Sequence, residues 1–318
     1  MDGGATVRDL DETASALLAE ALEGLSGPRK RLSPKWLYDR RGSELFEAIT
    51  ALPEYYLTRT EAAILSANAA RLAALVPPGG ALVELGSGAS VKTRTLLDAG
   101  RHLGAYVPID ISADFLHATA DDLRARYPGL AVHPVVGDFT RPVSLPAAVE
   151  GRAKAGFFPG STIGNLAPDD AAGLLAGARA WPGVEAFVLG ADMVKDAGEL
   201  VAAYADAQGV TAAFISNILR RLNDEVHADF DLDGLVYRAI WNAEAAQIEM
   251  GLVSRRDQVV GLGGEVIAFA EDETIHVSTS RKYTAGSLSA LVGRGGWRIE
   301  EMVTDPANRF AVAVLRPA

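Results

Sequence analysis

The feature that most restricts the fold is an alternation of short apolar runs with helical stretches between Gly79 and Met193. Runs such as ALVELG, AYVPID and EAFVLGADM have the length of strands, and the segments between them show apolar residues at helical spacing. Strands that alternate with helices predict βαβ crossovers, and therefore a parallel sheet covered on both faces. We predict an α/β domain with a Rossmann-like sheet here.

The flanking regions have a different character. Residues 8–76 show helical spacing, residues 195–223 are again helical, and the stretch that follows to about residue 283 alternates like an antiparallel meander. Residues 285–318 read as helix, strand and strand, which could return to the first sheet. We therefore predict a Rossmann-like domain of residues 61–194 plus 285–318, and a smaller α+β domain of residues 1–60 plus 195–284.

Composition excludes several classes of function. The chain has 30 Lys and Arg against 41 Asp and Glu, a net charge of −11, which argues against nucleic acid as a partner. It has no cysteine, and its five histidines show no i, i+4 pair, so we expect neither disulfides nor a metal site. The start, MDGGATVRDLDETA, lacks a signal-peptide pattern, and no stretch is apolar enough to span a membrane. We expect a cytoplasmic monomer.

A glycine loop follows the first predicted strand, in LVELGSGAS. Glycines in such a loop let backbone amides approach a ligand at the carboxyl edge of the sheet. The dinucleotide fingerprint also needs a glycine at its sixth position, where this chain has Val91 after Gly86 and Gly88. Nicotinamide binding is therefore disfavoured.

Two acidic residues end the next two predicted strands. Asp110 in VPID is placed to accept from two ribose hydroxyls, and Asp138 in VVGDF from an adenine amine. Lys92, in the first turn after the loop, could pair with a carboxylate. Together they predict a site for adenosine without pyrophosphate, a layout that resembles the class I S-adenosylmethionine methyltransferases.

Longer strings make the resemblance more specific. The chain resembles the histidine-specific Nα-methyltransferases of ergothioneine biosynthesis, and the likeness extends over nearly its whole length. The strings that carry it are SPKWLYDRRGSELFEAITALPEYYLTRTEAAIL, VELGSGASVKTR, GSTIGNL, GADMVKD, AYADAQGVTAAF, ADFDLD, QIEM and SRKY.

This resemblance implies a reaction and a site. The implied reaction moves methyl groups from S-adenosylmethionine to the α-amine of a free amino acid, histidine or a related aromatic one, up to the trimethylated betaine, and leaves S-adenosylhomocysteine. Tyr38 and Tyr55 are implied near the reacting amine. The implied coenzyme contacts are Tyr55, Gly86, Gly88, Lys92, Asp110, Asp138 and Phe139, and the implied amino-acid contacts are Tyr55, Asn165, Tyr204, Met250, Ser278 and Ser280.

The chain departs from the family pattern at one of these positions. In the family, a glutamate that receives the imidazole stands two residues before the serine that Ser280 matches, and here that position is Ser278. Losing a charge-assisted hydrogen bond would cost about 1.5–3 kcal/mol, roughly tenfold to a hundredfold in discrimination. Alternation along the strand would put His276 on the face of both serines, where it could alter the pocket, but we expect a plain exposed strand histidine instead. Tyrosine, phenylalanine, tryptophan or another aromatic amino acid therefore competes with histidine as substrate.

Two other functions stay open on sequence alone. A binding protein could keep the coenzyme pocket without catalysis, and an NAD-dependent oxidoreductase is the third alternative.

Overall fold

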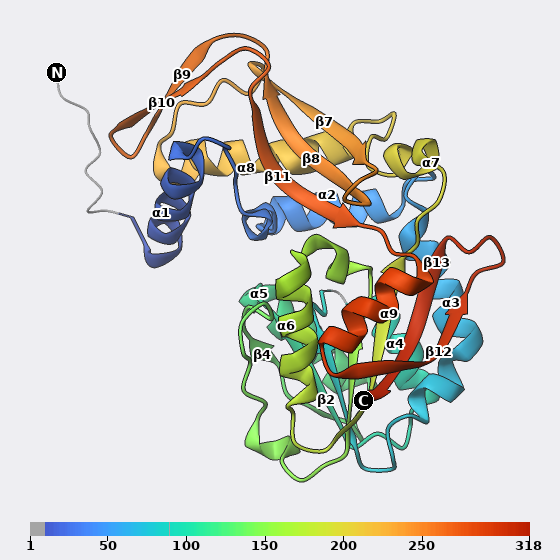
Figure 1. The fold of residues 1–318 in the computed structure, drawn as a ribbon. Helices are drawn as coiled ribbons and strands as arrows, with labels where there is room; N and C mark the ends of the chain where they lie inside the picture. Colours follow the sequence, from blue (N-terminus) through green and yellow to red (C-terminus); the bar gives the residue numbers. More distant parts are fainter. Residues whose placement is uncertain (1–9, 89) are drawn as a thin grey trace. The chain divides into compact units, whose positions relative to one another are not determined.

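The computed structural model of the protein describes residues 10–88 and 90–318, and it divides into two compact units (Figure 1). Residues 1–9, which hold most of the start read for a signal peptide, lie outside the described residues. The first unit contains the chain up to Tyr55 and Asp196–Thr279; the second contains Tyr56–Lys195 and Ser280–Ala318. Our sequence-based division changes domain at 60/61, 194/195 and 284/285.

The described residues of the second unit form an eight-stranded sheet. In spatial order its strands are β12 (Trp297–Thr304), β13 (Phe310–Pro317), β6 (Val184–Asp192), β5 (Lys154–Phe158), β1 (Ala81–Leu85), β2 (Ala105–Asp110) and β3 (Ala131–Val132), with β4 (Val135–Val136) also paired to β2. Strands β6, β5, β1, β2 and β3 run parallel, and β13 is antiparallel to β6 and β12. The predicted Rossmann-like α/β fold is confirmed, and residues 285–318 do return to the sheet.

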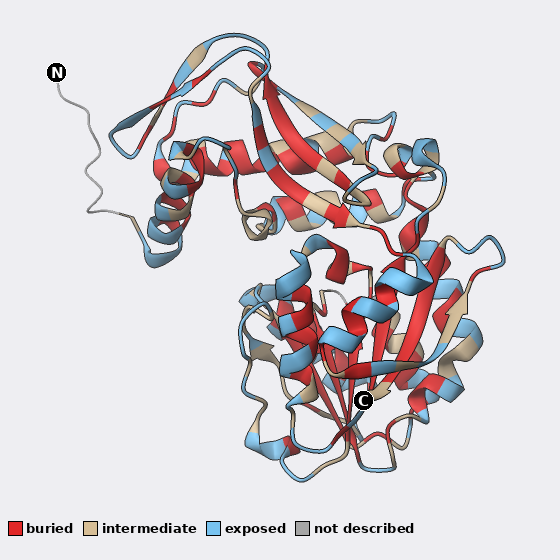
Figure 2. Ribbon diagram, viewed as in Figure 1, coloured by how far each residue is buried: buried red, intermediate tan, exposed pale blue. Residues whose placement is uncertain are grey.

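Helices cover this sheet, as the βαβ pattern requires. They are α3 (Tyr56–Ala73), α4 (Val91–Ala99), α5 (Ala113–Arg126), α6 (Pro168–Arg179) and α9 (Ala285–Arg294), with short turns η3 (Ala147–Val149) and η4 (Thr162–Asn165). Val83 and Leu85 belong to a buried cluster with Leu175 of α6 and Leu288 of α9. Because side chains alternate along a strand, Glu84 faces the opposite side. Figure 2 shows the central strands almost entirely buried.

The first unit combines helices with two small sheets. Helix α8 (Val210–Val226) packs against α1 (Glu12–Ser26), α2 (Arg40–Thr50) and the sheet formed by β7 (Leu235–Asn242), β8 (Gln247–Ser254) and β11 (Thr274–Arg281). A separate hairpin, β9 (Gln258–Leu262) and β10 (Glu265–Phe269), interrupts the predicted meander between β8 and β11. The turn η2 (Pro34–Leu37) and the short helix α7 (Ala197–Ala202) complete the unit.

One strand of the sheet differs from expectation. The predicted third strand is two short pieces, β3 and β4, because Pro134 between them has no N–H to donate to a ladder.

None of the helices in the described part of the chain combines the length and apolar character needed to cross a membrane.

Candidate active site

The glycine loop leaves β1 at the carboxyl edge of the sheet. Gly86 and Gly88 have φ of 65° and 47°, a backbone conformation that residues other than glycine rarely adopt. The N–H groups of Gly86 and Ser87 donate to the carbonyl oxygen of Ile109 at 2.8 and 3.2 Å. A Cβ on Gly88 would meet no atom within 4 Å, whereas one on Gly86 would lie 3.2 Å from the Phe139 ring. The buried Ser87 hydroxyl has no hydrogen-bond partner among the described residues.

Asp110 is fixed beside this loop. Its two carboxylate oxygens accept from the N–H groups of Gly88 at 2.9 Å and of Ser112 at 3.0 Å. Asp138 follows β4, and one of its oxygens accepts from the N–H and the hydroxyl of Thr140 at 2.9 and 2.6 Å. The structure therefore brings Gly86, Gly88, Asp110 and Phe139 together, and Asp138 is the residue next to Phe139 along the chain.

Lys92 has a partner that the sequence reasoning missed. Its ammonium group is ion-paired with Glu61 of α3, whose side chain is fully buried. Both Glu61 carboxylate oxygens also lie 2.9 Å from the Gly160 nitrogen, which follows β5. Glu61 thus links α3 to α4, which carries Lys92, and to the loop before Asn165. Its position midway between buried Leu57 and Leu65, four residues from each, is the signal that could have found it.

A buried carboxyl group lies beneath the glycine loop. Glu84 of β1 accepts from the hydroxyl of Thr93 in α4 at 2.5 Å and from that of Tyr106 in β2. Burial raises the pKa of Glu84 to about 8, although both hydrogen bonds act to lower it. The site therefore has a carboxyl group that joins β1, β2 and the first turns of α4.

The second unit also carries two of the predicted amino-acid contacts. Asn165 is exposed at the end of η4, the turn that follows β5. Ser280 lies at the end of β11, is only 3% exposed, and accepts from the Lys282 ammonium at 2.9 Å.

Three predicted tyrosines gather in the first unit. The Tyr38 ring packs edge-on against Phe46 and Phe214, with ring centres 5.8 and 5.5 Å apart. Tyr55 packs edge-on against Phe46 at 6.5 Å and Tyr204 at 5.9 Å. Phe46 and Phe214 were not predicted, because contacts between α2 and α8 depend on tertiary packing. The five rings form one aromatic cluster.

Buried polar groups of α8 hold the segment that carries Tyr38. Asn217, 1% exposed, donates from Nδ2 to an Asp39 carboxylate oxygen at 2.8 Å. One turn further, Arg221 donates to the Trp36 carbonyl oxygen at 2.8 Å. These two contacts bracket Tyr38, so the placement of this tyrosine depends on α8.

Met250 and Ser278 lie in the neighbouring strands β8 and β11 and are 6% and 8% exposed. His276 does not share a face with the two serines, and the expected exposed strand histidine is what the structure shows. His276 is exposed and its Nε2 lies 3.0 Å from the Thr279 hydroxyl. Side chains three residues apart point to opposite faces of a regular strand, so the alternation changes between them. Ser278 and Ser280 are buried instead.

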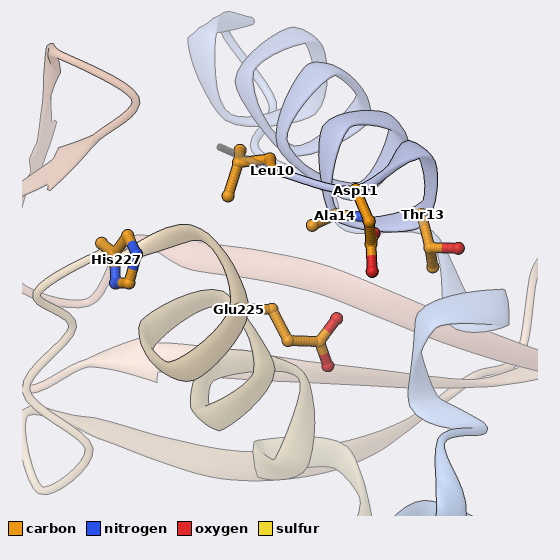
Figure 3. A pocket seen from close by; sticks show the side chains of 6 residues that line it. All are labelled: Leu10, Asp11, Thr13, Ala14, Glu225 and His227. Atoms are coloured by element: carbon orange, nitrogen blue, oxygen red, sulfur yellow. The ribbon is translucent and has the colours of Figure 1, made fainter. Parts of the chain in front are cut away.

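A separate hollow of about 320 Å³ lies where α1 begins and α8 ends (Figure 3). Its acids have structural partners: Glu225 is paired with Arg221 at 2.6 Å, and Asp11 caps α1 by accepting from the Ala14 N–H at 2.8 Å. The hollow is lined by Leu10, Asp11, Thr13, Ala14, Glu225 and His227. It contains none of the predicted site residues, so we place no site there.

Within residues 10–88 and 90–318, no group of three or more His, Cys, Asp or Glu could hold a metal ion.

Comparison with known proteins identifies the family. The model of the histidine-specific, S-adenosylmethionine-dependent methyltransferases matches residues 17–317. The chain belongs to this family. It is 42% identical to the histidine N-alpha-methyltransferase of Mycolicibacterium smegmatis, over 96% of each chain, and 41% identical to that of Mycobacterium tuberculosis, over 94% of each. It is also 32% identical to ergothioneine biosynthesis protein 1 of Neurospora crassa, over 85% of this chain and 31% of that protein.

Membership in the family confirms three predictions: the resemblance, the enzyme class and S-adenosylmethionine as the coenzyme. The oxidoreductase alternative is not supported. The individual site residues stay predictions.

Proposed function

We propose that this methyltransferase acts on the α-amine of a free amino acid, histidine or a related aromatic one, and continues to the trimethylated betaine. The observation that carries the proposal is the 42% identity to a histidine N-alpha-methyltransferase over 96% of both chains. The predicted site residues supply a chemical reason for it.

The residues around the glycine loop fit S-adenosylmethionine. Open space at Gly88 and the unpartnered Ser87 hydroxyl leave room and a hydrogen-bonding group for a ligand. Each Asp110 oxygen already accepts one N–H and can accept again, so the pair can bind ribose hydroxyls. Lys92 has three N–H donors, of which Glu61 engages one, and the others can bind the coenzyme carboxylate.

When bound, the coenzyme supplies a methyl group on a positively charged sulfur, which is a good leaving group. The protein must then align a neutral amine, and alignment alone can lower a barrier by about 7–11 kcal/mol. The hydroxyls of Tyr38 and Tyr55 are placed by the aromatic cluster and can orient that amine or a water that takes its proton. Exclusion of water from the site would favour the neutral amine over its charged form.

Ser278 bears on the choice of amino acid. Its side chain is short, neutral and buried, so it offers an imidazole a weaker hydrogen bond than a carboxylate would. We therefore propose that histidine is accepted with less preference over tyrosine, phenylalanine and tryptophan than a glutamate would give.

The test is incubation with S-adenosylmethionine and each of these amino acids, read by mass spectrometry of the methylated products. Methylated histidine or another aromatic amino acid supports the proposal. Coenzyme binding without turnover of any amino acid would instead indicate a non-catalytic protein. Asp110→Asn should weaken coenzyme binding, whereas Asp169→Asn, whose carboxylate pairs with Arg294 on the surface, should not.

A further inference from the structure

Three chain connections join the two units, and a residue close to each of them contacts the buried carboxylate of Asp192. On the second unit's side, the residues nearest these connections are Tyr56, Lys195 and the segment that starts at Ser280. Tyr56, Lys195 and Lys282 each contact Asp192. The connections lie at Tyr55/Tyr56, Lys195/Asp196 and Thr279/Ser280.

Asp192 is held rigidly by its own backbone. It is the last residue of β6, is fully buried, and pairs with Phe310 of the antiparallel strand β13. Its N–H donates to the Ser161 hydroxyl at 2.9 Å, and its carbonyl oxygen accepts from the Tyr283 N–H at 2.9 Å. The backbone of Asp192 is therefore fixed in the sheet, and this restricts where its carboxylate can lie.

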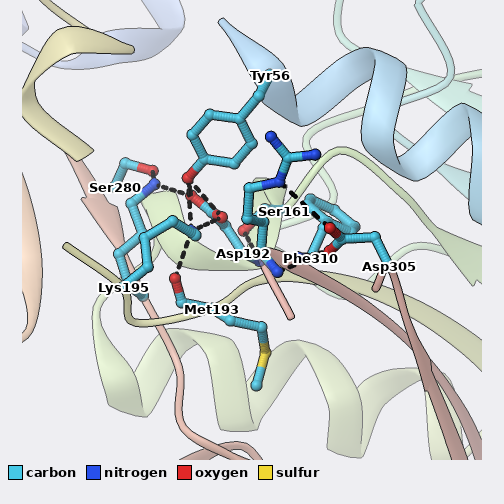
Figure 4. A network of polar contacts seen from close by, with 10 residues as sticks. Tyr56, Ser161, Asp192, Met193, Lys195, Ser280, Asp305 and Phe310 are labelled. Atoms are coloured by element: carbon cyan, nitrogen blue, oxygen red, sulfur yellow. Dashed lines mark hydrogen bonds and ion pairs between the residues drawn. The ribbon is translucent and has the colours of Figure 1, made fainter. Parts of the chain in front are cut away.

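The Asp192 carboxylate contacts a different side chain next to each of the three connections. The Tyr56 hydroxyl lies 2.9 Å from both Asp192 oxygens, and the Lys195 ammonium lies 2.6 Å from one of them and 2.6 Å from the Tyr56 oxygen (Figure 4). The Lys282 ammonium lies 2.6 Å from the other oxygen and donates to Ser280 at 2.9 Å. One carboxylate thus fixes the three segments relative to one another.

Such a cluster is a costly way to stabilise a fold. Removing charged groups from water carries a penalty that well-packed apolar side chains avoid. Burial lowers the pKa of Lys282, and Asp192 opposes that effect. What the polar cluster provides and apolar packing does not is a fixed direction for each contact.

We propose that Asp192 is a positioning residue for the amino-acid site. It fixes the segments that carry Tyr55, which precedes Tyr56, and Ser278 and Ser280, which precede Lys282. This inference rests on the proposed function, because these three are its predicted amino-acid contacts. In the described part of the chain, the predicted coenzyme residues other than Tyr55 make no contact with the cluster, so coenzyme binding should depend on it much less than amino-acid binding does.

The test compares Asp192→Asn, Lys282→Met and the milder Tyr56→Phe with Lys154→Met. Lys154 is a matched control in the same unit: it is 2% exposed and donates to the backbone carbonyl oxygens of Arg152 and Pro182. We expect the cluster variants to raise the KM for the amino acid or lower kcat by about tenfold or more, with the Kd of S-adenosylhomocysteine within about twofold of wild type. Lys154→Met should lower Tm without either kinetic change.

Amide hydrogen exchange gives a readout that does not need turnover. Exchange in residues 53–58, 193–198 and 278–283 should be faster in Tyr56→Phe and Asp192→Asn and unchanged in Lys154→Met. Wild-type kinetics in Tyr56→Phe together with unchanged exchange would overturn the proposal, as would an equal loss of coenzyme affinity. If wild type methylates no amino acid, the proposed function fails, while the exchange and coenzyme measurements still decide the positioning role. If Asp192→Asn does not fold, Tyr56→Phe decides.

Discussion

At the scale of single residues, the chemistry of this site depends on how each polar side chain is partnered. Lys92 was predicted to contact a ligand, and the structure shows that it is paired with a buried glutamate. Ser278 is buried at the position where the resemblance implied a glutamate. Glu84 is a buried acid beneath the glycine loop.

Ser278→Glu should shift the choice of substrate toward histidine. A carboxylate would add a charge-assisted hydrogen bond to an imidazole, worth roughly tenfold to a hundredfold in kcat/KM relative to phenylalanine. Competition between histidine and phenylalanine, followed by mass spectrometry, measures this ratio. Thr274→Glu, an exposed change earlier in the same strand, is the control and should leave the ratio unaltered. An unchanged preference in Ser278→Glu would count against a role for this position in the pocket.

Glu84 should make the protein less stable as pH rises. Burial raises its folded pKa from 4.5 to about 8, so between these values the unfolded chain releases a proton that the folded chain keeps. This group then lowers the free energy of unfolding by about 1.4 kcal/mol per pH unit in that window, and its effect levels off above it.

Glu84→Gln removes the titrating group and keeps a similar shape. The difference in free energy of unfolding, variant minus wild type, should therefore increase between about pH 5.5 and 8.5. Urea denaturation across this range measures it, and Glu244→Gln, at an exposed position, provides the control. A difference that does not vary with pH would show that Glu84 is already ionised in the folded protein.

At the scale of secondary-structure elements, sequence periodicity was a good guide to what forms and a poor guide to what touches. The strands and helices from Ala81 to Asp192 follow the predicted alternation, because each signal is local. The aromatic cluster, the Glu61–Lys92 pair and the Asp192 contacts join residues far apart in the chain, and no local pattern encodes them. Alternation alone put His276 on the wrong face, because an irregularity in a strand is not visible in that pattern.

Helix α8 should matter for catalysis through Asn217. Asn217→Ala removes a buried hydrogen bond to Asp39, which should cost about 1–2 kcal/mol of stability and loosen the segment that carries Tyr38. We expect kcat/KM to fall roughly tenfold while the Kd of S-adenosylhomocysteine stays unchanged. Asn223→Ala is the matched control on the same helix, because the Asn223 amide exchanges hydrogen bonds of 2.9 Å with the Phe230 backbone, away from Tyr38 in the chain. Equal kcat/KM values in the two variants would show that Asn217 of α8 does not position Tyr38.

At the scale of the whole molecule, the chain builds each unit from separate segments. The second unit needs both Tyr56–Lys195 and Ser280–Ala318, because β13 and β12 complete its sheet beside β6. The composition change after Met193 and the final helix–strand–strand pattern made this return predictable. The positions of the three connections were less so, since the chain passes between units within continuous elements such as β11.

This division predicts where the coenzyme will stabilise the protein. The glycine loop, Asp110 and Asp138 all belong to the second unit, so S-adenosylhomocysteine at about 100 times its Kd should stabilise that unit by about 2.7 kcal/mol. Hydrogen exchange should slow most at residues 84–88, 109–112 and 137–140. Exchange in β9 and β10, which belong to the first unit, serves as the internal reference and should change little. Protection that appeared first in the hairpin and spared the glycine loop would place the coenzyme elsewhere, and would remove the physical basis for assigning Asp110 to its ribose.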